Sequence, residues 1–354
     1  MNTEFTEKLN KVNSIEEFYA GTGIFITGSS GFVGKGLLEK LIRVCPRIGV
    51  IFILIRPKKN QTMEERYKEI MDDPIFDDAR AKNPSLLKKI HPVEGDISLP
   101  KIGLSEEDRN MLIENVNILF HVAATLNFKE PLNAAVNTNV KGTFRIFELC
   151  NELKHVISVI HVSTAYSNAN IPEIEEKVYS YGELKDKFVK HAIEIPMNDL
   201  LWYPWCATVS NRYVYSILTL FLHTLPAFIM DIFLRLQGSK PRMMKISKHY
   251  DTMSTVTNYF SIRQWSFKRD NVIDMMKEVK TLEDSDIVKL DLQDMDWDKY
   301  IALCVIAIKK FIFKEDPKSL DAARRRLSIF YWLHQMTKAF PIIILLTIIL
   351  RVMY

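Results

Sequence analysis

A cluster of glycines near the N-terminus is the sequence feature that most constrains the fold of this chain. The chain has 12 glycines in 354 residues, and six of them lie between Gly21 and Gly36. A short apolar run, 23–27, precedes the cluster, and apolar residues at helical spacing follow it in 32–43. Because glycine has no Cβ, this order of strand, turn and helix lets the backbone approach a phosphate group closely. The order therefore predicts a dinucleotide-binding unit.

Alternating strands and helices extend this unit to about residue 162. The run Val50–Ile55 is continuously apolar, which is typical of a strand with both faces covered. Further strands are predicted at 89–94, 117–121 and 156–162, and a long helix at 132–153. Because strands that alternate with helices form parallel sheets, we predict an α/β fold with a Rossmann-like, doubly wound parallel sheet that stops after its fifth strand.

The second half of the chain is predicted to be mostly helical. After Gly142 only Gly182 and Gly238 remain, and the apolar runs from Tyr213 onward are long. The predicted domains are an NAD(P)-binding part at 15–200, a helical part at 201–338 and an apolar C-terminal membrane anchor at 339–354.

Two apolar stretches bear on membrane contact. Val214–Met230 and Ala339–Leu350 contain no Asp, Glu, Lys or Arg, but both are shorter than the ~20 residues of a usual spanning helix. For the first stretch, a buried core helix and a membrane segment are both open. The second follows Arg324, Arg325, Arg326 and Lys338, and basic residues before an apolar tail are typical of the cytosolic side of a membrane.

Charge and cysteine content exclude several classes of protein. Lys and Arg number 47 and Asp and Glu 43, so the net charge of +4 gives no support for nucleic-acid binding. The four cysteines are far apart and form no CxxC pair, so we predict no metal site and no disulfide scaffold. The polar N-terminus lacks a secretory signal, and we therefore expect an intracellular protein that is not secreted.

The segment Thr27–Gly34 reads TGSSGFVG and supplies the predicted phosphate cradle. Gly28 permits the tight turn, Gly31 lets the backbone approach a pyrophosphate, and Gly34 allows the helix to pack against the strand. Free N–H groups at the start of the helix then face the phosphates. The predicted cofactor contacts in this segment are Thr27, Gly28, Ser30, Gly31, Phe32, Val33 and Gly34.

The residues after the second predicted strand favour NADP(H) over NAD(H). An NAD site usually has an Asp or Glu there, which binds the ribose 2′-hydroxyl. Here the strand is followed by Arg56, Pro57, Lys58 and Lys59, without an acid. Because Arg can hold a 2′-phosphate with paired hydrogen bonds, we predict NADPH as the cofactor, with Arg56 as the main contact and Lys58 or Lys59 assisting.

The G-x-x-G-x-x-G spacing resembles that of the extended short-chain dehydrogenase/reductase superfamily. The resemblance implies three further cofactor-site residues. Asp96, after the third predicted strand, matches an Asp near the adenine amino group. Ala123, after the fourth, leaves space beside the cofactor, and Asn139, on the next helix, matches an Asn that stabilises the active-site backbone.

Longer segments are similar to the fatty acyl-CoA reductases. They include FITGSSGFVGKGLLEKLIRVCP, FHVAATLNFKEPLNAAVNTNVKGT and HVSTAYSN in the first half and HTLPA and KEDP in the second. The resemblance covers nearly the whole chain outside a stretch around 181–198. It implies a membrane-associated enzyme that reduces long-chain fatty acyl-CoA with NADPH to a fatty alcohol, by way of the aldehyde.

The same resemblance implies three catalytic residue types. A Ser at the end of the fifth strand binds the carbonyl oxygen, and Ser163 matches it. A Tyr donates a proton to that oxygen, and a Lys four residues later lowers the pKa of the Tyr and holds the nicotinamide ribose. Tyr181 and Lys185 form the one Tyr-x-x-x-Lys pair here, but 13 Tyr and 31 Lys make about one such pair expected by chance.

The chain departs from the family after HVSTAYSN. In the family the Tyr-x-x-x-Lys lies in a helix well downstream, with more strands after it, whereas here Trp202 follows after only 34 residues. The family's central segment is therefore predicted to be missing. Tyr181 and Lys185 are either a catalytic pair or the exposed start of a helix, and both interpretations stay open. The alternative function is a catalytically impaired, membrane-anchored NADP-binding isoform or a partner of full-length reductases.

The resemblance also implies binding partners and a location. They are fatty acyl-CoA as substrate, membrane lipid, and an intracellular membrane facing the cytosol, in the endoplasmic reticulum or peroxisome. Assembly of the chain with itself or with other reductases stays open. A polar substrate such as a sugar nucleotide is a further hypothesis, which the HTLPA and KEDP segments disfavour.

Overall fold

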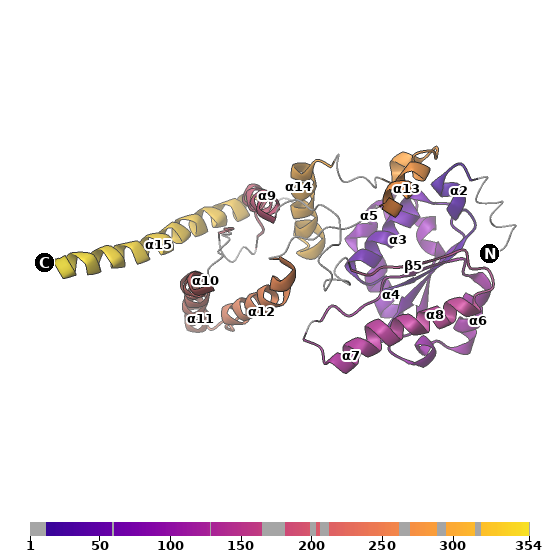
Figure 1. The fold of residues 1–354 in the computed structure, drawn as a ribbon, viewed down its shortest axis with the longest axis horizontal. Coiled ribbons are helices and arrows are strands. Elements are labelled where there is room, and N and C mark those ends of the chain that lie inside the picture. Colours follow the sequence, from indigo (N-terminus) through magenta and orange to yellow (C-terminus); the bar gives the residue numbers. More distant parts are fainter. Residues whose placement is uncertain are drawn as a thin grey trace. The chain divides into compact units, whose positions relative to one another are not determined.

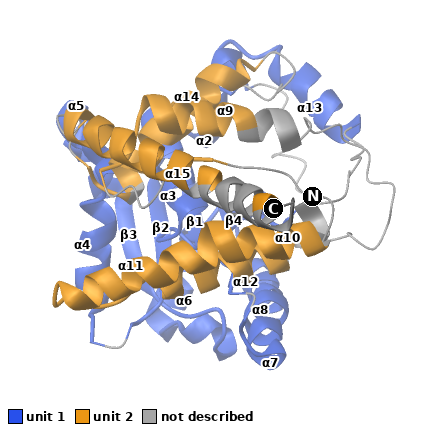
Figure 2. Ribbon diagram, turned by 90° about the vertical axis from the view of Figure 1, so that its left-hand side faces the viewer, with its two compact units in different colours: residues 1–170, 269–293 blue, residues 171–268, 294–354 orange. Residues whose placement is uncertain are grey.

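The computed structural model describes residues 12–58, 60–127, 129–164, 181–198, 203–205, 212–261, 270–288, 295–315 and 320–353. The chain forms two compact units, which Figure 2 colours separately. Unit 1 consists of residues 1–170 and 269–293, and unit 2 of residues 171–268 and 294–354. The sheet lies in unit 1, and unit 2 is helical in its described part.

Unit 1 is built around a parallel sheet of five strands (Figure 1). They are β1 (Gly23–Thr27), β2 (Val50–Ile55), β3 (Ile90–Glu94), β4 (Ile118–His121) and β5 (Ser158–His161), in the spatial order β3-β2-β1-β4-β5. The α-helices of this unit are α2 (Ile15–Tyr19), α3 (Phe32–Val44), α4 (Met63–Met71), α5 (Asp77–Lys82), α6 (Glu106–Asn115), α7 (Leu132–Val136), α8 (Gly142–Glu152) and α13 (Asp270–Val279). Shorter helical turns are η1 (Pro74–Phe76), η2 (Pro84–Lys89), η3 (Pro100–Gly103), η4 (Asn137–Lys141) and η7 (Ser285–Ile287). The strand order reverses between β1 and β4, and the predicted Rossmann-like, doubly wound sheet is confirmed.

Two apolar layers cover the two faces of this sheet, because side chains alternate along each strand. In β1, Ile24 and Ile26 lie in the layer formed with α3, whereas Phe25 lies in the layer formed with α6 and α8. In β2, Ile53 belongs to the first layer and Leu54 to the second. Figure 1 shows α3 and α8 on opposite faces. Burial on both faces explains why β1 and β2 are continuously apolar in sequence.

Two elements of unit 1 differ from the sequence-based expectation. The strand predicted at 156–162 is shorter, and β5 lies at one edge of the sheet, with Val159 36% exposed. The helix predicted at 132–153 contains a π-helical turn, η4, between α7 and α8. A π turn inserts a residue into the helical repeat, which the apolar spacing of the sequence does not reveal.

The described part of unit 2 contains helices only. They are α9 (Tyr181–Glu194), α10 (Arg212–Thr219), η6 (Leu220–Thr224), α11 (Leu225–Leu236), α12 (Met243–Ser261), α14 (Trp297–Ala307), η8 (Ile308–Ile312) and α15 (Leu320–Met353). This confirms the mostly helical C-terminal region. The predicted domain border at 338/339 falls inside α15, so the apolar tail continues that helix. The side chains of residues 341–349 lie outside the described part, and the anchor at 339–354 stays a prediction.

A buried ion pair explains part of the KEDP segment. The Nζ atom of Lys309 lies 3.4 Å from the carboxylate of Glu315, and both side chains are 8% exposed. Lys309 also donates to the carbonyl oxygen of Pro196 at 2.8 Å, and Glu315 accepts from the N–H of Asn198 at 2.9 Å. The pair therefore fastens the segment after α9 to the end of η8, and Glu315 has a structural role.

Candidate active site

The glycine-rich turn joins β1 to α3 and has no room for a Cβ at two of its positions. Gly28 has a φ of +75°, a conformation that residues with a Cβ rarely adopt, and its carbonyl oxygen accepts from the N–H of Gly31 at 3.0 Å. A Cβ on Gly28 would lie 2.7 Å from the backbone nitrogen of Ala123, and one on Gly34 would lie 2.1 Å from the Gly28 carbonyl oxygen. The turn therefore needs glycine at positions 28 and 34.

The start of α3 offers backbone donors to a phosphate group. Gly31 is the N-cap residue of α3 and has no side chain that could accept from the first-turn N–H groups. The side chains of Ser30, Phe32 and Val33 beside it are exposed. These backbone N–H groups lie next to a turn that has no Cβ atoms at Gly28 and Gly34. This arrangement fits the pyrophosphate of a dinucleotide.

A buried hydrogen-bond network connects the end of β1 to the end of β4. The Thr27 hydroxyl accepts from the N–H groups of Val122 and Ala123, both at 3.2 Å, and its own proton goes to Nδ1 of His121 at 2.7 Å. Thr143 donates to the carbonyl oxygen of Asn139 at 2.8 Å, so it accepts from Nε2 of His121 at 3.0 Å. The network assigns the neutral Nε2–H tautomer to His121.

The surroundings of His121 keep its imidazole uncharged. The side chain is completely buried, and the His161 ring stacks on it with 5.0 Å between the ring centroids. Burial, with a smaller contribution from the charge of a protonated His161, lowers the pKa of His121 to about 4. The hydroxyl of Thr27 and the Ala123 amide are therefore held in one arrangement at neutral pH.

The basic residues predicted to bind a 2′-phosphate follow β2. β1 and β2 are parallel, with Ile26 paired to Ile53, so Arg56 and the glycine turn lie at the same edge of the sheet. The Arg56 side chain is exposed, and its carbonyl oxygen accepts a hydrogen bond from the buried guanidinium of Arg66. Lys59 lies outside the described residues.

The remaining predicted cofactor residues shape loops at this edge. Asp96 accepts from the N–H of Ser98 at 2.8 Å and so orders the loop after β3. Asn139 accepts from the N–H of Thr125 at 2.8 Å and donates to the Thr125 carbonyl oxygen at 3.1 Å. Through these two bonds Asn139 fixes the backbone after β4, and Ala123 is fixed by Thr27.

The three predicted catalytic residues belong to two different units. Ser163 lies two residues after the end of β5, with an exposed side chain, in unit 1. Tyr181 and Lys185 lie on α9 in unit 2, and their side chains lie outside the described part. Helix α9 includes Gly182, so this glycine does not interrupt it. The catalytic roles of all three stay predictions.

Sequence reasoning missed three polar residues beside the glycine turn. His121 and Thr143 form the network that orients Thr27, and the buried Ser29 hydroxyl has no hydrogen-bond partner among the described residues. A usable signal existed for His121, since a polar residue ends an otherwise apolar buried strand. For Thr143 the spacing of residues in the sequence gave no such signal.

Comparisons with known proteins agree with this site. A family model described as male sterility protein, of the NAD-binding type, matches residues 26–227, and a second model with the same description matches 222–315. Fatty acyl-CoA reductase wat of Drosophila melanogaster is 26% identical, over 92% of this chain and 90% of that protein. Fatty acyl-CoA reductase 1 of Rattus norvegicus is 25% identical, over 89% of each.

The relatives are longer than this chain inside the aligned region. The alignment with the Drosophila protein spans 473 positions against 354 residues here, so at least 119 of those positions have no counterpart in this chain. Among solved structures, the reductase domain of a nonribosomal peptide synthetase from Mycobacterium tuberculosis is 22% identical, over 50% of this chain and 41% of that one, with a TM-score of 0.36. The chain belongs to the male sterility protein family, the family of the fatty acyl-CoA reductases, and is by that resemblance an oxidoreductase that uses a nicotinamide cofactor.

Proposed function

We propose that this chain reduces long-chain fatty acyl-CoA to fatty alcohol with NADPH, by way of the aldehyde, on an intracellular membrane facing the cytosol. The observation that carries the proposal is the glycine cradle, where a Cβ on Gly34 would lie 2.1 Å from the Gly28 carbonyl oxygen, in a chain of this family. We further propose that residues 15–200 bind the cofactor, that 201–338 form the helical domain, and that 339–354 anchor the chain.

The proposed mechanism assigns a task to each group of residues. NADPH, when bound, would supply one hydride for each of the two reductions, and coenzyme A leaves as the thiol after the first. Backbone N–H groups at the start of α3 bind its pyrophosphate, and Arg56 binds the 2′-phosphate. Ser163 binds the carbonyl oxygen of the thioester and then of the aldehyde, where negative charge develops, and Tyr181 with Lys185 delivers the proton.

The choice of NADPH is tested at Arg56. Replacing Arg56 with alanine removes the one guanidinium directly after β2, so the Kd for NADPH is expected to rise at least tenfold while the Kd for NADH stays within twofold. The measurement is isothermal titration calorimetry of the full chain in detergent. Lys68→Ala, which removes an exposed positive charge from α4, outside the predicted cofactor contacts, is the control. Equal weakening for both cofactors by Arg56→Ala contradicts the assignment.

The reaction is tested at Ser163. The full chain in lipid vesicles, supplied with NADPH and stearoyl-CoA, is expected to form octadecanol, quantified by gas chromatography with mass spectrometry. Ser163→Ala is expected to lower kcat at least tenfold, because a donor to the developing oxyanion is lost. Ser158→Ala, at the other end of β5, is the control. Product at the same rate in both variants removes Ser163 from the mechanism.

A second candidate function is favoured by the positions of the relatives that have no counterpart in this chain. With at least 119 positions of a relative unmatched, the chain is alternatively a membrane-anchored NADP-binding partner of full-length reductases. This candidate predicts that NADPH binds in the calorimeter and that the chain alone forms no octadecanol. It also predicts that Tyr181→Phe leaves NADPH binding unchanged. The proposed enzyme predicts product and a rate loss in Tyr181→Phe.

A further inference from the structure

The helix Tyr213–Leu236 is apolar but unburied. Across the described residues it is the one helix long and apolar enough to cross a membrane, and only 6% of its most apolar part is buried. Of the two alternatives left open for this stretch, the low burial favours a membrane segment over a buried core helix. Exposed large apolar side chains occur along its whole length, among them Ile217, Phe221, Phe228 and Phe233. A surface of this size without a protein cover marks a contact with lipid or another apolar partner.

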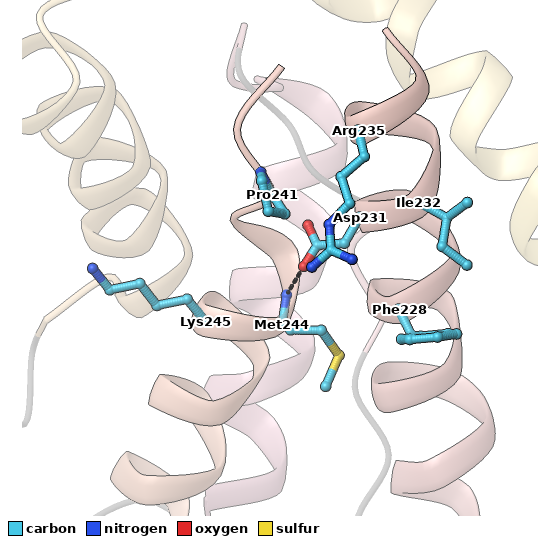
Figure 3. Close-up of a pocket in the computed structure, with 7 residues that line it drawn as sticks. All are labelled: Phe228, Asp231, Ile232, Arg235, Pro241, Met244 and Lys245. Atoms are coloured by element: carbon cyan, nitrogen blue, oxygen red, sulfur yellow. Dashed lines mark hydrogen bonds between the residues drawn. The ribbon is translucent and has the colours of Figure 1, made fainter. Parts of the chain in front are cut away.

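Helix α12 is fastened alongside this apolar helix. At one end the Asp231 carboxylate accepts from the N–H groups of Arg242, Met243 and Met244 at 2.8, 2.8 and 3.0 Å, and so caps the start of α12 (Figure 3). The two helices therefore form a closed hairpin at this turn.

Two further contacts hold the hairpin together along its length. The His223 ring stacks on the Tyr250 ring with 5.6 Å between centroids, and the Tyr215 hydroxyl lies 3.4 Å from that of Ser254. The two contacts lie eight residues apart on the apolar helix, or about 12 Å along its axis, and four residues apart on α12, or about 6 Å. α12 therefore follows the apolar helix over most of its length.

This pairing disfavours a simple membrane crossing. Asp251 lies eight residues after the start of α12, or about 12 Å along its axis, and a charged side chain near the centre of a bilayer is costly. If the apolar helix crossed the bilayer, the paired α12 would bring this carboxylate into the hydrocarbon. A hairpin lying in the plane of the interface keeps it near the headgroups.

The turn of the hairpin is strongly basic. Between residues 232 and 250 the chain has five basic residues and no Asp or Glu; they are Arg235, Lys240, Arg242, Lys245 and Lys248. All five are exposed. In the pocket of Figure 3 the cations Arg235 and Lys245 border the apolar side chains of Phe228, Ile232 and Met244. Apolar and cationic groups side by side match the acyl chains and phosphates of an anionic lipid surface.

We propose that the hairpin 213–261 lies in the membrane plane, with its apolar helix in the acyl layer and its basic turn on anionic lipid headgroups. The inference deepens the membrane part of the proposed function and does not depend on catalysis. It is independent of the predicted anchor at 339–354, because it concerns how residues 213–239 meet the lipid.

The test is labelling of single introduced cysteines with a membrane-impermeant maleimide, read by peptide mass so that native cysteines are distinguished. The full chain is added to sealed vesicles of phosphatidylcholine, with or without 30% phosphatidylserine. Phe228→Cys is expected to be labelled without vesicles, protected by the anionic vesicles and at least tenfold less protected by the neutral ones. Tyr213→Cys and Ser239→Cys lie at the two ends of the apolar helix. Both are expected to be labelled with and without vesicles.

Charge variants test the role of the basic turn. Lys240→Gln, Lys245→Gln and Lys248→Gln combined are expected to raise the lipid concentration for half-protection of Phe228→Cys at least tenfold. Lys82→Gln, Lys88→Gln and Lys101→Gln, which remove the same charge from exposed positions in unit 1, are expected to change it less than twofold.

Each opposing result overturns the proposal. Protection of Tyr213→Cys or Ser239→Cys alone, reversed by detergent, means that the helix crosses the bilayer. Equal labelling of Phe228→Cys with and without vesicles means that the hairpin does not enter lipid. Equal protection by neutral and anionic vesicles means that the basic turn does not bind anionic headgroups. Failure of acyl-CoA reduction leaves the labelling result unchanged, so the two proposals fail separately.

Discussion

Replacing Gly34 with alanine is expected to lower the free energy of unfolding by about 3 kcal/mol or more and to weaken NADPH binding about 100-fold. The new Cβ would lie 2.1 Å from the Gly28 carbonyl oxygen, 2.7 Å from the Gly28 carbonyl carbon and 2.8 Å from the Ser29 Cα atom. All three are backbone atoms, so no side chain can swing away. Relief requires that α3 move away from the turn, which displaces the N–H groups that face the phosphates.

A matched control lies two residues further along the same helix. A Cβ on Gly36 would meet nothing within 4 Å, and an alanine inside a helix is favoured over glycine by up to about 1 kcal/mol. Gly36→Ala is therefore expected to be neutral or stabilising, with unchanged cofactor affinity. The measurements are urea unfolding followed by circular dichroism, and calorimetry with NADPH. Similar midpoints and affinities for both variants contradict the role of Gly34 in the cradle.

Acidification is expected to destabilise unit 1 through His121. The pKa of this group is about 4 in the folded chain and about 6.5 in an unfolded one. Above pH 6.5 both states are neutral and His121 contributes no pH dependence. Between pH 6.5 and 4 the unfolded state binds the additional proton, so stability falls as pH falls, by up to about 1.4 kcal/mol per pH unit and about 3 kcal/mol in total.

The His121 contribution is isolated by comparison with His121→Gln. The glutamine amide can donate to Thr143 but does not titrate, so this variant is expected to lose less stability than the parent between pH 7 and 4.5. Other groups titrate in both proteins and cancel in the difference. The measurement is the urea midpoint of each protein at half-unit pH steps. Parallel pH profiles for the two proteins exclude a neutral, buried His121.

The sheet could be predicted from sequence where its strands are buried on both faces. The predicted and observed limits of β1 and β2 coincide, because a continuous apolar run has one interpretation in a parallel sheet. β5 is an edge strand and was predicted too long, since Val156 and Val162 at its ends are apolar without being buried in it. Strand propensity alone did not identify these ends.

The candidate site was predictable only in part. Gly28 and Gly34 could be assigned because their backbone conformation and lack of a Cβ are encoded in the residue type. The His121–Thr143 contact joins side chains 22 residues apart in sequence on different elements, and only the fold brings them together. Likewise, an uncharged run such as 214–230 is the same in sequence whether protein or lipid covers it, so its exposure had to come from the structure.

The central position of β1 has a consequence for synthesis of this chain. One side of β1 pairs with β2, which follows soon after it, whereas the other side pairs with β4, where Thr27 meets His121 94 residues later. Long-range parallel pairings form slowly, because the entropy of the intervening loop is lost first. While the ribosome is still making those residues, the second edge of the buried strand β1 has no native neighbour. During this interval the unpaired edge is open to non-native pairing and aggregation.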